Sequence, residues 1–332
     1  MDFNHTEERR MLADSLRRTL ARGADWAALA ELGVLGALFT ESEGGFGGTG
    51  FDLAVVFEEL GRAGSVEPVL EAGLAGGLLA DAGRADLVER IIAGDLKVTL
   101  GWQEPGLRYD LGPLSTRAEG GRLTGRKSFV TNAEGAGLIL VTALHNGAPH
   151  LFALAPDAPG VTLHTTPALM GGTISELTLT AAPADLIGPA DLDARLAAAT
   201  LAVCADTLGV METVKAMTLD YLRTRTQFGR AIGSFQALQH RMADVAIEIE
   251  MARSAVINLS GALTAPDRDR QVSAAKSLIG RTARLVAEES IQMHGGIAMT
   301  EAYALAPLAR RLIASDHRFG DEDWHLARFL RS

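Results

Sequence analysis

The chain has almost no cysteine, because Cys204 is the only one among 332 residues. A single cysteine cannot close an intramolecular disulfide, and it cannot supply a cysteine-rich metal site. The eight histidines offer no substitute, since no two of them lie at i, i+4 and no His-Glu-x-x-His sequence occurs. The sequence therefore predicts no bound metal, and its cysteine usage indicates a reducing compartment.

The chain also lacks long basic runs and long apolar runs. Its formal net charge is −10, and no block of Lys and Arg is longer than a doublet. No broad basic surface is therefore available for nucleic acid or an anionic membrane. The longest nearly apolar stretch, residues 196–205, is far shorter than the roughly 20 residues that cross a bilayer. We expect a cytoplasmic protein that binds neither nucleic acid nor membrane.

Three regions differ in the spacing of their apolar residues. Residues 1–95 and 189–332 repeat apolar side chains at helical spacing, and the second of these regions favours a four-helix bundle. Residues 96–188 contain short β-rich runs between turn residues, a pattern typical of an antiparallel sandwich or small barrel. We therefore predict an α+β multidomain protein with an N-terminal helical domain, a middle β-domain and a C-terminal helical bundle at these boundaries.

A polar segment in the third region combines cations with aromatic side chains. Arg223, Arg225 and Arg230 lie close in sequence to Phe228 and Phe235. Arg binds phosphate oxygens, and an aromatic ring offers a packing surface to a heteroaromatic ligand. Two interpretations stay open on these grounds. The segment is either a site for a phosphate-bearing heteroaromatic ligand, or a set of arginines that compensate a helix dipole beside a solvated loop.

Two motifs give the chain a family resemblance. Residues 225–244 match R-x-Q-F-G-x-x-I-x-x-F-Q-x-x-Q-H-x-x-A-D, and residues 292–300 read Q-M-H-G-G-I-A-M-T. In this order and at this separation, they resemble the two signature stretches of the flavin-dependent acyl-CoA dehydrogenases. Residues 33–47 and 125–133 also resemble that family's early helix-loop and the β-domain strand beside its flavin. The resemblance covers nearly the whole chain and implies the same helical, β, helical order.

The resemblance implies FAD as a cofactor that is shared across a subunit interface. In the family, the R-x-Q-F-G loop and the Q-x-x-G-G turn of one subunit reach the pyrophosphate and adenine side of FAD held by its neighbour. Paired glycines suit such a role, because a backbone that approaches a phosphate closely cannot tolerate a Cβ atom. The cofactor-binding residues implied here are Arg225, Gln227, Phe228, Gly229, Phe235, Gln236, Gln292, Gly295 and Gly296.

The loop that holds the flavin ring in the family is altered in this chain. The family pattern T-E-P-G-x-G-S-D corresponds to residues 103–110, which keep Glu-Pro-Gly but carry Arg108 and Tyr109 in place of a small Gly-Ser pair. These bulky side chains occupy space that the cofactor needs. We therefore predict that this subunit's own flavin pocket is closed.

The catalytic base of the family is also missing. Dehydrogenation needs a carboxylate that removes the α-proton of the substrate while the β-hydrogen leaves as hydride. The two places where the family carries this Glu correspond to Phe319 and Ala199, and neither side chain accepts a proton. Asp206 and the pair Asp316-His317 are the substitutes nearest in sequence.

These features together predict a non-catalytic subunit of an acyl-CoA dehydrogenase, which completes the FAD site of a related, longer catalytic chain. The family includes unequal α2β2 pairs of this kind, particularly for CoA thioesters of steroid side chains. The resemblance also implies an acyl-CoA substrate and an electron-accepting flavoprotein as partners. Two alternatives remain: a self-sufficient homotetramer that uses Asp206 or another base, and a redox-inactive acyl-CoA-binding or scaffold protein.

Overall fold

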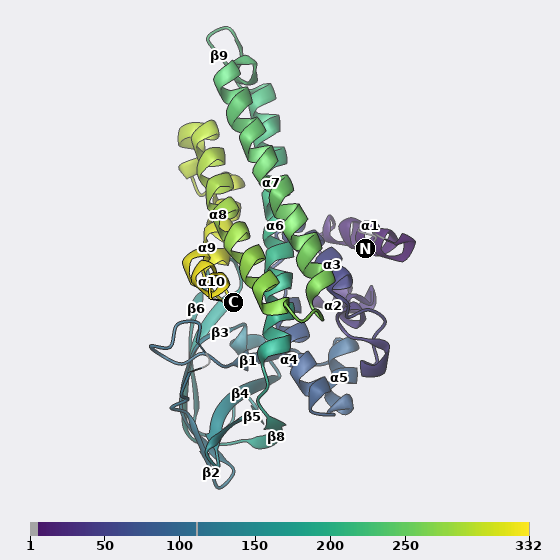
Figure 1. The fold of residues 1–332 in the computed structure, drawn as a ribbon, viewed down its shortest axis with the longest axis vertical. Coiled ribbons are helices and arrows are strands. Elements are labelled where there is room, and N and C mark those ends of the chain that lie inside the picture. The colour runs from purple at the N-terminus through teal and green to yellow at the C-terminus, as the bar shows by residue number, and fades with distance from the viewer. Residues whose placement is uncertain (1–5, 111, 332) are drawn as a thin grey trace. The chain divides into compact units, whose positions relative to one another are not determined.

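A computed structural model describes residues 6–110 and 112–331, and packing divides the chain into two compact units (Figure 1). Unit 1 comprises the chain to Gly23, the segment Gly50–Ser65 and the chain from Thr200. Unit 2 comprises Ala24–Thr49 and Val66–Ala199. The residues of the first predicted region are thus shared between both units.

Unit 1 is built from helices. They are α1 (Glu7–Leu20), α3 (Gly50–Ala63), most of α6 (Asp193–Thr224), α7 (Gln236–Ala262), α8 (Arg268–His294), α9 (Leu305–Asp316) and α10 (Glu322–Phe329). A short hairpin of β9 (Thr226–Gln227) and β10 (Arg230–Ala231) joins α6 to α7. The apolar stripes seen in the sequence form the core, since Val245, Ile249 and Val256 of α7 and Val272 and Ile279 of α8 are buried.

Helices α3 and α6 cross with their backbones in direct contact. A Cβ atom at Gly61 would collide with the backbone of Asp206, and one at Gly209 would collide with the backbone of Glu58. Because only glycine fits at such a crossing, these two positions determine where α3 meets α6.

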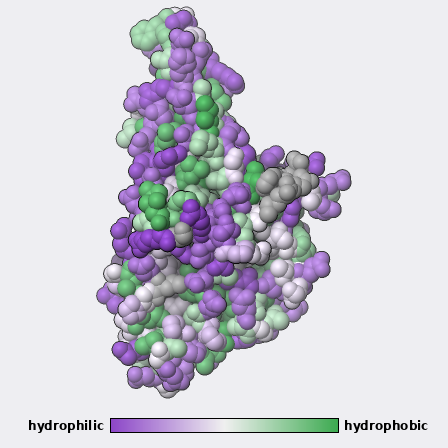
Figure 2. Space-filling view, viewed as in Figure 1, coloured by the Kyte–Doolittle hydropathy of each residue, from purple (hydrophilic) through white to green (hydrophobic). Residues whose placement is uncertain are grey.

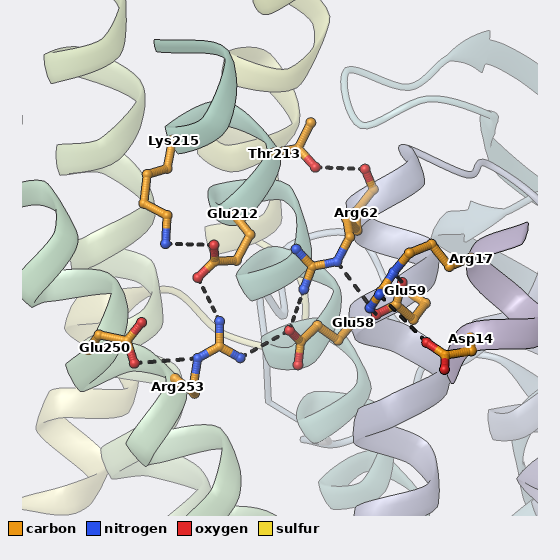
Figure 3. Close-up of polar contacts among 10 residues, drawn as sticks. All are labelled: Asp14, Arg17, Glu58, Glu59, Arg62, Glu212, Thr213, Lys215, Glu250 and Arg253. Atoms are coloured by element: carbon orange, nitrogen blue, oxygen red, sulfur yellow. Dashed lines mark hydrogen bonds and ion pairs between the residues drawn. The ribbon is translucent and has the colours of Figure 1, made fainter. Parts of the chain in front are cut away.

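Charged side chains connect α1, α3, α6 and α7 (Figure 3). Arg17 of α1 donates to both carboxylate oxygens of Glu59 on α3, at 2.6 and 3.0 Å. Arg253 of α7 donates to Glu58 of α3 at 3.0 Å and to Glu212 of α6 at 2.6 Å. Several of these side chains line a pocket of about 350 Å³. The network holds four helices of unit 1 in register through paired charges.

Unit 2 contains a sheet flanked by short helices. The helices are α2 (Trp26–Glu31), α4 (Val69–Asp81) and α5 (Ala85–Ile92). The strands are β1 (Val98–Gly101), β2 (Arg117–Glu119), β3 (Arg122–Thr131), β4 (Leu138–His145), β5 (Ala148–Leu154), β6 (Val161–Pro167), β7 (Thr173–Pro183) and β8 (Asp185–Pro189).

The described strands of unit 2 form one eight-stranded sheet in the order β6-β7-β3-β2-β4-β5-β8, with β1 also paired to β4. Most neighbours are antiparallel, as predicted, whereas β1 and β2 each run parallel to β4. The sheet is therefore mixed. The sequence did not predict this, because apolar alternation indicates which face of a strand is buried but not the direction of its neighbour. Leu123, Val130, Val141, Phe152 and Leu177 belong to the core of this unit.

One described helix, α6, is long and apolar enough to cross a membrane by length and composition. However, 72% of its most apolar window is buried inside the protein, as expected of a core helix. On the face in Figure 2, polar side chains predominate along the long helices and apolar ones are scattered among them.

Candidate cofactor site

The connection between α6 and α7 is a tight, exposed hairpin at the far end of both helices (Figure 1). Gln227 pairs with Arg230, which leaves Phe228 and Gly229 as its two-residue turn. Both turn residues have positive φ, 53° and 78°, as a type I′ turn requires. Phe228 thus occupies a backbone region that costs a non-glycine residue about 1–2 kcal/mol, and its side chain is 89% exposed.

The second candidate segment follows the last residue of α8, His294. Gly295 has a φ of 68°, a backbone conformation that favours glycine at this position. Gly296 has no such φ, and a Cβ atom built there meets no heavy atom of the described residues within 4 Å. Nothing in the described part of the chain therefore requires glycine at position 296.

The structure brings both segments to the same end of unit 1. Tyr221, one turn before Arg225, stacks on His294 with ring centroids 4.4 Å apart. Arg241 of α7 donates to both carboxylate oxygens of Glu289 on α8, at 2.5 and 3.0 Å. All predicted cofactor residues lie here, and all are exposed except the half-buried Phe235: Arg225, Gln227, Phe228, Gly229, Gln236, Gln292, Gly295 and Gly296.

These residues fit the phosphate arm of a dinucleotide. Arg225 presents an exposed guanidinium, and Phe228 presents an exposed ring beside Phe235, with centroids 6.0 Å apart. A Cβ atom built at Gly295 or Gly296 meets no heavy atom of the described residues within 4 Å, so a ligand has room to approach the backbone of this turn. The N–H of Gly295 itself donates to the carbonyl of Ile291. The arrangement can bind phosphate oxygens and pack against a heteroaromatic ring.

The altered flavin-ring loop lies in unit 2 and rests on a buried ion pair. Lys127 donates to Glu104 at 2.7 Å, and both side chains are almost completely buried. Burial alone would raise the pKa of Glu104, but hydrogen bonds from Lys127, Ser115 and Thr116 outweigh it and hold that pKa at about 2. Glu104, the first residue of the Glu-Pro-Gly sequence, therefore has a structural role that needs no cofactor.

Further along this loop, Arg108 and Tyr109 replace the small residues. Arg108 has a φ of 43°, the left-handed region that favours glycine. Its carbonyl accepts a hydrogen bond from the side-chain amide of Gln103 at 2.9 Å. The guanidinium of Arg108 lies over the ring of Tyr109, 5.4 Å from its centroid. The loop keeps a glycine-like backbone but carries two large side chains in contact with each other.

Phe319, at one of the two expected base positions, lies in the turn between α9 and α10. Its φ of 60° is again left-handed. Lys276, buried in α8, donates to the carbonyls of Asp316 and Gly320, both at 2.7 Å. His325 of α10 donates to the carbonyl of Phe319 at 3.1 Å. Two buried side chains thus hold the turn, and residue 319 itself cannot take up a proton.

Ala199, at the other expected base position, is buried in α6. The substitutes considered from the sequence are engaged elsewhere. Asp206 accepts from Arg311 with both oxygens, at 2.6 and 3.2 Å. Asp316 is buried and accepts the backbone N–H of Glu322 at 3.0 Å. Among the described residues, no group of three or more His, Cys, Asp or Glu could hold a metal ion.

Comparison with known proteins identifies the family. Family models described as the N-terminal and C-terminal domains of acyl-CoA dehydrogenase match residues 6–94 and 190–331. The acyl-CoA dehydrogenase FadE28 of Mycobacterium tuberculosis is 31% identical, over 92% of this chain and 91% of its own length. IpdE2 of the same organism is 30% identical, over 89% and 87% of the two lengths. This chain therefore belongs to the acyl-CoA dehydrogenase family.

Solved structures agree with this assignment and with the predicted fold class. A variant of the Tcur3481-Tcur3483 steroid acyl-CoA dehydrogenase superposes with a TM-score of 0.89 at 29% identity, covering 98% of this chain and 97% of that one. The ChsE4-ChsE5 complex of Mycobacterium tuberculosis gives a TM-score of 0.88 at 26% identity, covering 100% and 98%. The helical, β, helical architecture predicted from the sequence is confirmed.

Proposed function

We propose that this chain is the non-catalytic subunit of a hetero-oligomeric acyl-CoA dehydrogenase. It supplies Arg225, Phe228 and the Gly295–Gly296 turn to the phosphate and adenine side of an FAD whose ring lies in a related, longer partner chain. The observation that carries this proposal is the contrast within one chain. The exposed phosphate-arm segments are intact, whereas both expected base positions hold side chains that cannot accept a proton.

The missing base supports a dependent role. When bound, FAD accepts the β-hydrogen of an acyl-CoA as hydride. The α-proton must pass to a carboxylate, and loss of such a base typically costs about 10² to 10⁴ in rate. Phe319 and Ala199 offer none, and both oxygens of Asp206 are taken by Arg311. The partner chain therefore supplies the base in this proposal.

The flavin-ring loop supports the same division of labour. The side chains of Arg108 and Tyr109 occupy positions where the family carries small residues, and they are already in contact with each other. We infer that they exclude the flavin ring from this subunit's own pocket. The pocket that remains open is then that of the partner chain.

The nature of the partner and substrate is inferred from relatives. The ChsE4-ChsE5 complex pairs two named chains, and the Tcur3481-Tcur3483 protein is named a steroid acyl-CoA dehydrogenase. By analogy, we propose an α2β2 complex in the cytoplasm that acts on a CoA thioester, with a steroid side chain as the favoured acyl group. An electron-accepting flavoprotein would reoxidise the complex.

Purification of the tagged full-length chain from its own cells tests this function. We expect a related, longer acyl-CoA dehydrogenase to copurify, and we expect the complex to contain FAD and to oxidise an acyl-CoA. The chain produced alone should carry little FAD and show no turnover. Stoichiometric flavin with robust turnover in the chain alone would instead favour a self-sufficient homotetramer. A complex without FAD would favour the scaffold alternative.

A further inference from the structure

A buried histidine lies between the two segments that face the cofactor arm. His294 is 4% exposed and ends α8. Its ring stacks on Tyr221 of α6 at 4.4 Å with an interplanar angle of 25°. Tyr303, on the segment that leads to α9, lies 5.4 Å from the same ring. One imidazole therefore contacts aromatic side chains from two other parts of unit 1.

The hydrogen bonds of this imidazole define its protonation. Nδ1 lies 2.8 Å from the carbonyl oxygen of Ser290, and a carbonyl only accepts, so Nδ1 carries the proton. Nε2 is buried without a hydrogen-bond partner among the described residues. Burial also lowers the pKa of His294. The ring is thus neutral, and its stacking does not depend on a charge.

The stacked rings connect the two halves of the candidate site. The carbonyl of Tyr221 accepts the backbone N–H of Arg225 at 2.8 Å, at the point where α6 gives way to the hairpin. On the other side, His294 is followed directly by Gly295 and Gly296. The contact between Tyr221 and His294 therefore joins the end of α6, which directly precedes Arg225, to the end of α8, which directly precedes the glycine turn.

We propose that His294 is a positioning residue for the cofactor arm: its neutral ring, stacked on Tyr221 and in contact with Tyr303, sets the spacing between Arg225 and the Gly295–Gly296 turn. This inference rests on the proposed function. An N–H···O contact to a phosphate needs its donors placed within a few tenths of an ångström. Loss of the ring should misplace both donors at once, without removing either of them.

The test compares four variants in the purified FAD-containing complex. His294→Ala removes the ring and should weaken FAD binding at least about tenfold. His294→Phe keeps the stack and should stay within about threefold of wild type. Ser290→Ala is the matched control, because it removes a buried hydroxyl one turn away that has no hydrogen-bond partner among the described residues. Arg225→Ala tests the phosphate arm itself.

Dissociation constants for FAD are read from flavin fluorescence, and thermal unfolding reports the stability of each variant. Unchanged affinity in His294→Ala overturns the inference, and so does an equal loss in His294→Ala and His294→Phe. Unchanged affinity in Arg225→Ala instead overturns the proposed function. If His294→Ala does not fold, Tyr303→Leu removes the third ring of the cluster, which contacts both His294 and Tyr221. This variant should weaken FAD binding in the same direction, and unchanged affinity would overturn the inference.

Discussion

Gly296→Ala is expected to affect the stability of the fold and the affinity for FAD in opposite directions. Position 296 has no left-handed φ, and an added Cβ meets no described atom within 4 Å. Alanine should therefore be tolerated, and by restricting the unfolded chain it should raise the free energy of unfolding by up to about 1 kcal/mol. In the complex, the same methyl group would stand where a phosphate approaches the backbone.

The expected loss of FAD affinity follows from one displaced contact. A hydrogen bond to a charged group contributes about 1.5–3 kcal/mol, which is roughly ten- to more than a hundredfold in affinity. FAD titration of the complex and thermal unfolding of the same samples measure the two effects separately. Gly73→Ala in α4 is a matched control, because its added Cβ makes only an ordinary contact with Leu38. If Gly296→Ala binds FAD as tightly as wild type, the turn does not approach the phosphates.

Three further predictions concern buried ionisable side chains. Lys127→Met should cost the chain about 3–5 kcal/mol of stability by leaving Glu104 without its counter-ion, and adding Glu104→Gln should recover most of it; a loss below about 1 kcal/mol in denaturant unfolding contradicts this. The pKa of Glu104 is lowered from 4.5 to about 2. The contribution of its carboxylate to the free energy of unfolding is therefore complete above pH 4.5 and is lost as the pH falls towards 2. Glu104→Gln should remove this part of the acid sensitivity. The pKa of His325 is lowered from 6.5 to about 3 by burial and by Lys276, so acid destabilises the fold from pH 6.5 downward, and a denaturation series in which His325→Gln shows the same slope would contradict the buried neutral ring.

Local apolar periodicity was enough to predict the helices and the order of the regions. The stripe through Val245, Ile249 and Val256 is buried as its spacing indicates. The parallel pairing of β1 with β4 was not predictable in the same way, because it depends on which strands meet after long connections. The pattern of a strand indicates which of its faces is buried, but the neighbouring strand and its direction depend on the rest of the fold.

Only those residues of the candidate site that belong to a family motif were predictable from the sequence. The hairpin and the glycine turn were found by resemblance, and the structure places them at one end of unit 1. Lys276 and His294 were missed as contributors. Lys276 occupies an apolar stripe between Val272 and Ile279, and the carbonyls that accept from its amine lie 40 and 44 residues away. For Lys276, a lysine at an apolar position of the helical repeat is the only signal that the sequence offers.

Flavin content of the purified complex tests the central claim most directly. Flavin absorbance is measured against total protein in the complex of this chain with its longer partner. If the loop with Arg108 and Tyr109 closes this subunit's own pocket, as we propose, the complex should contain one FAD for each pair of unlike chains. A ratio of one FAD per chain would contradict it, since this chain would then hold a flavin ring of its own.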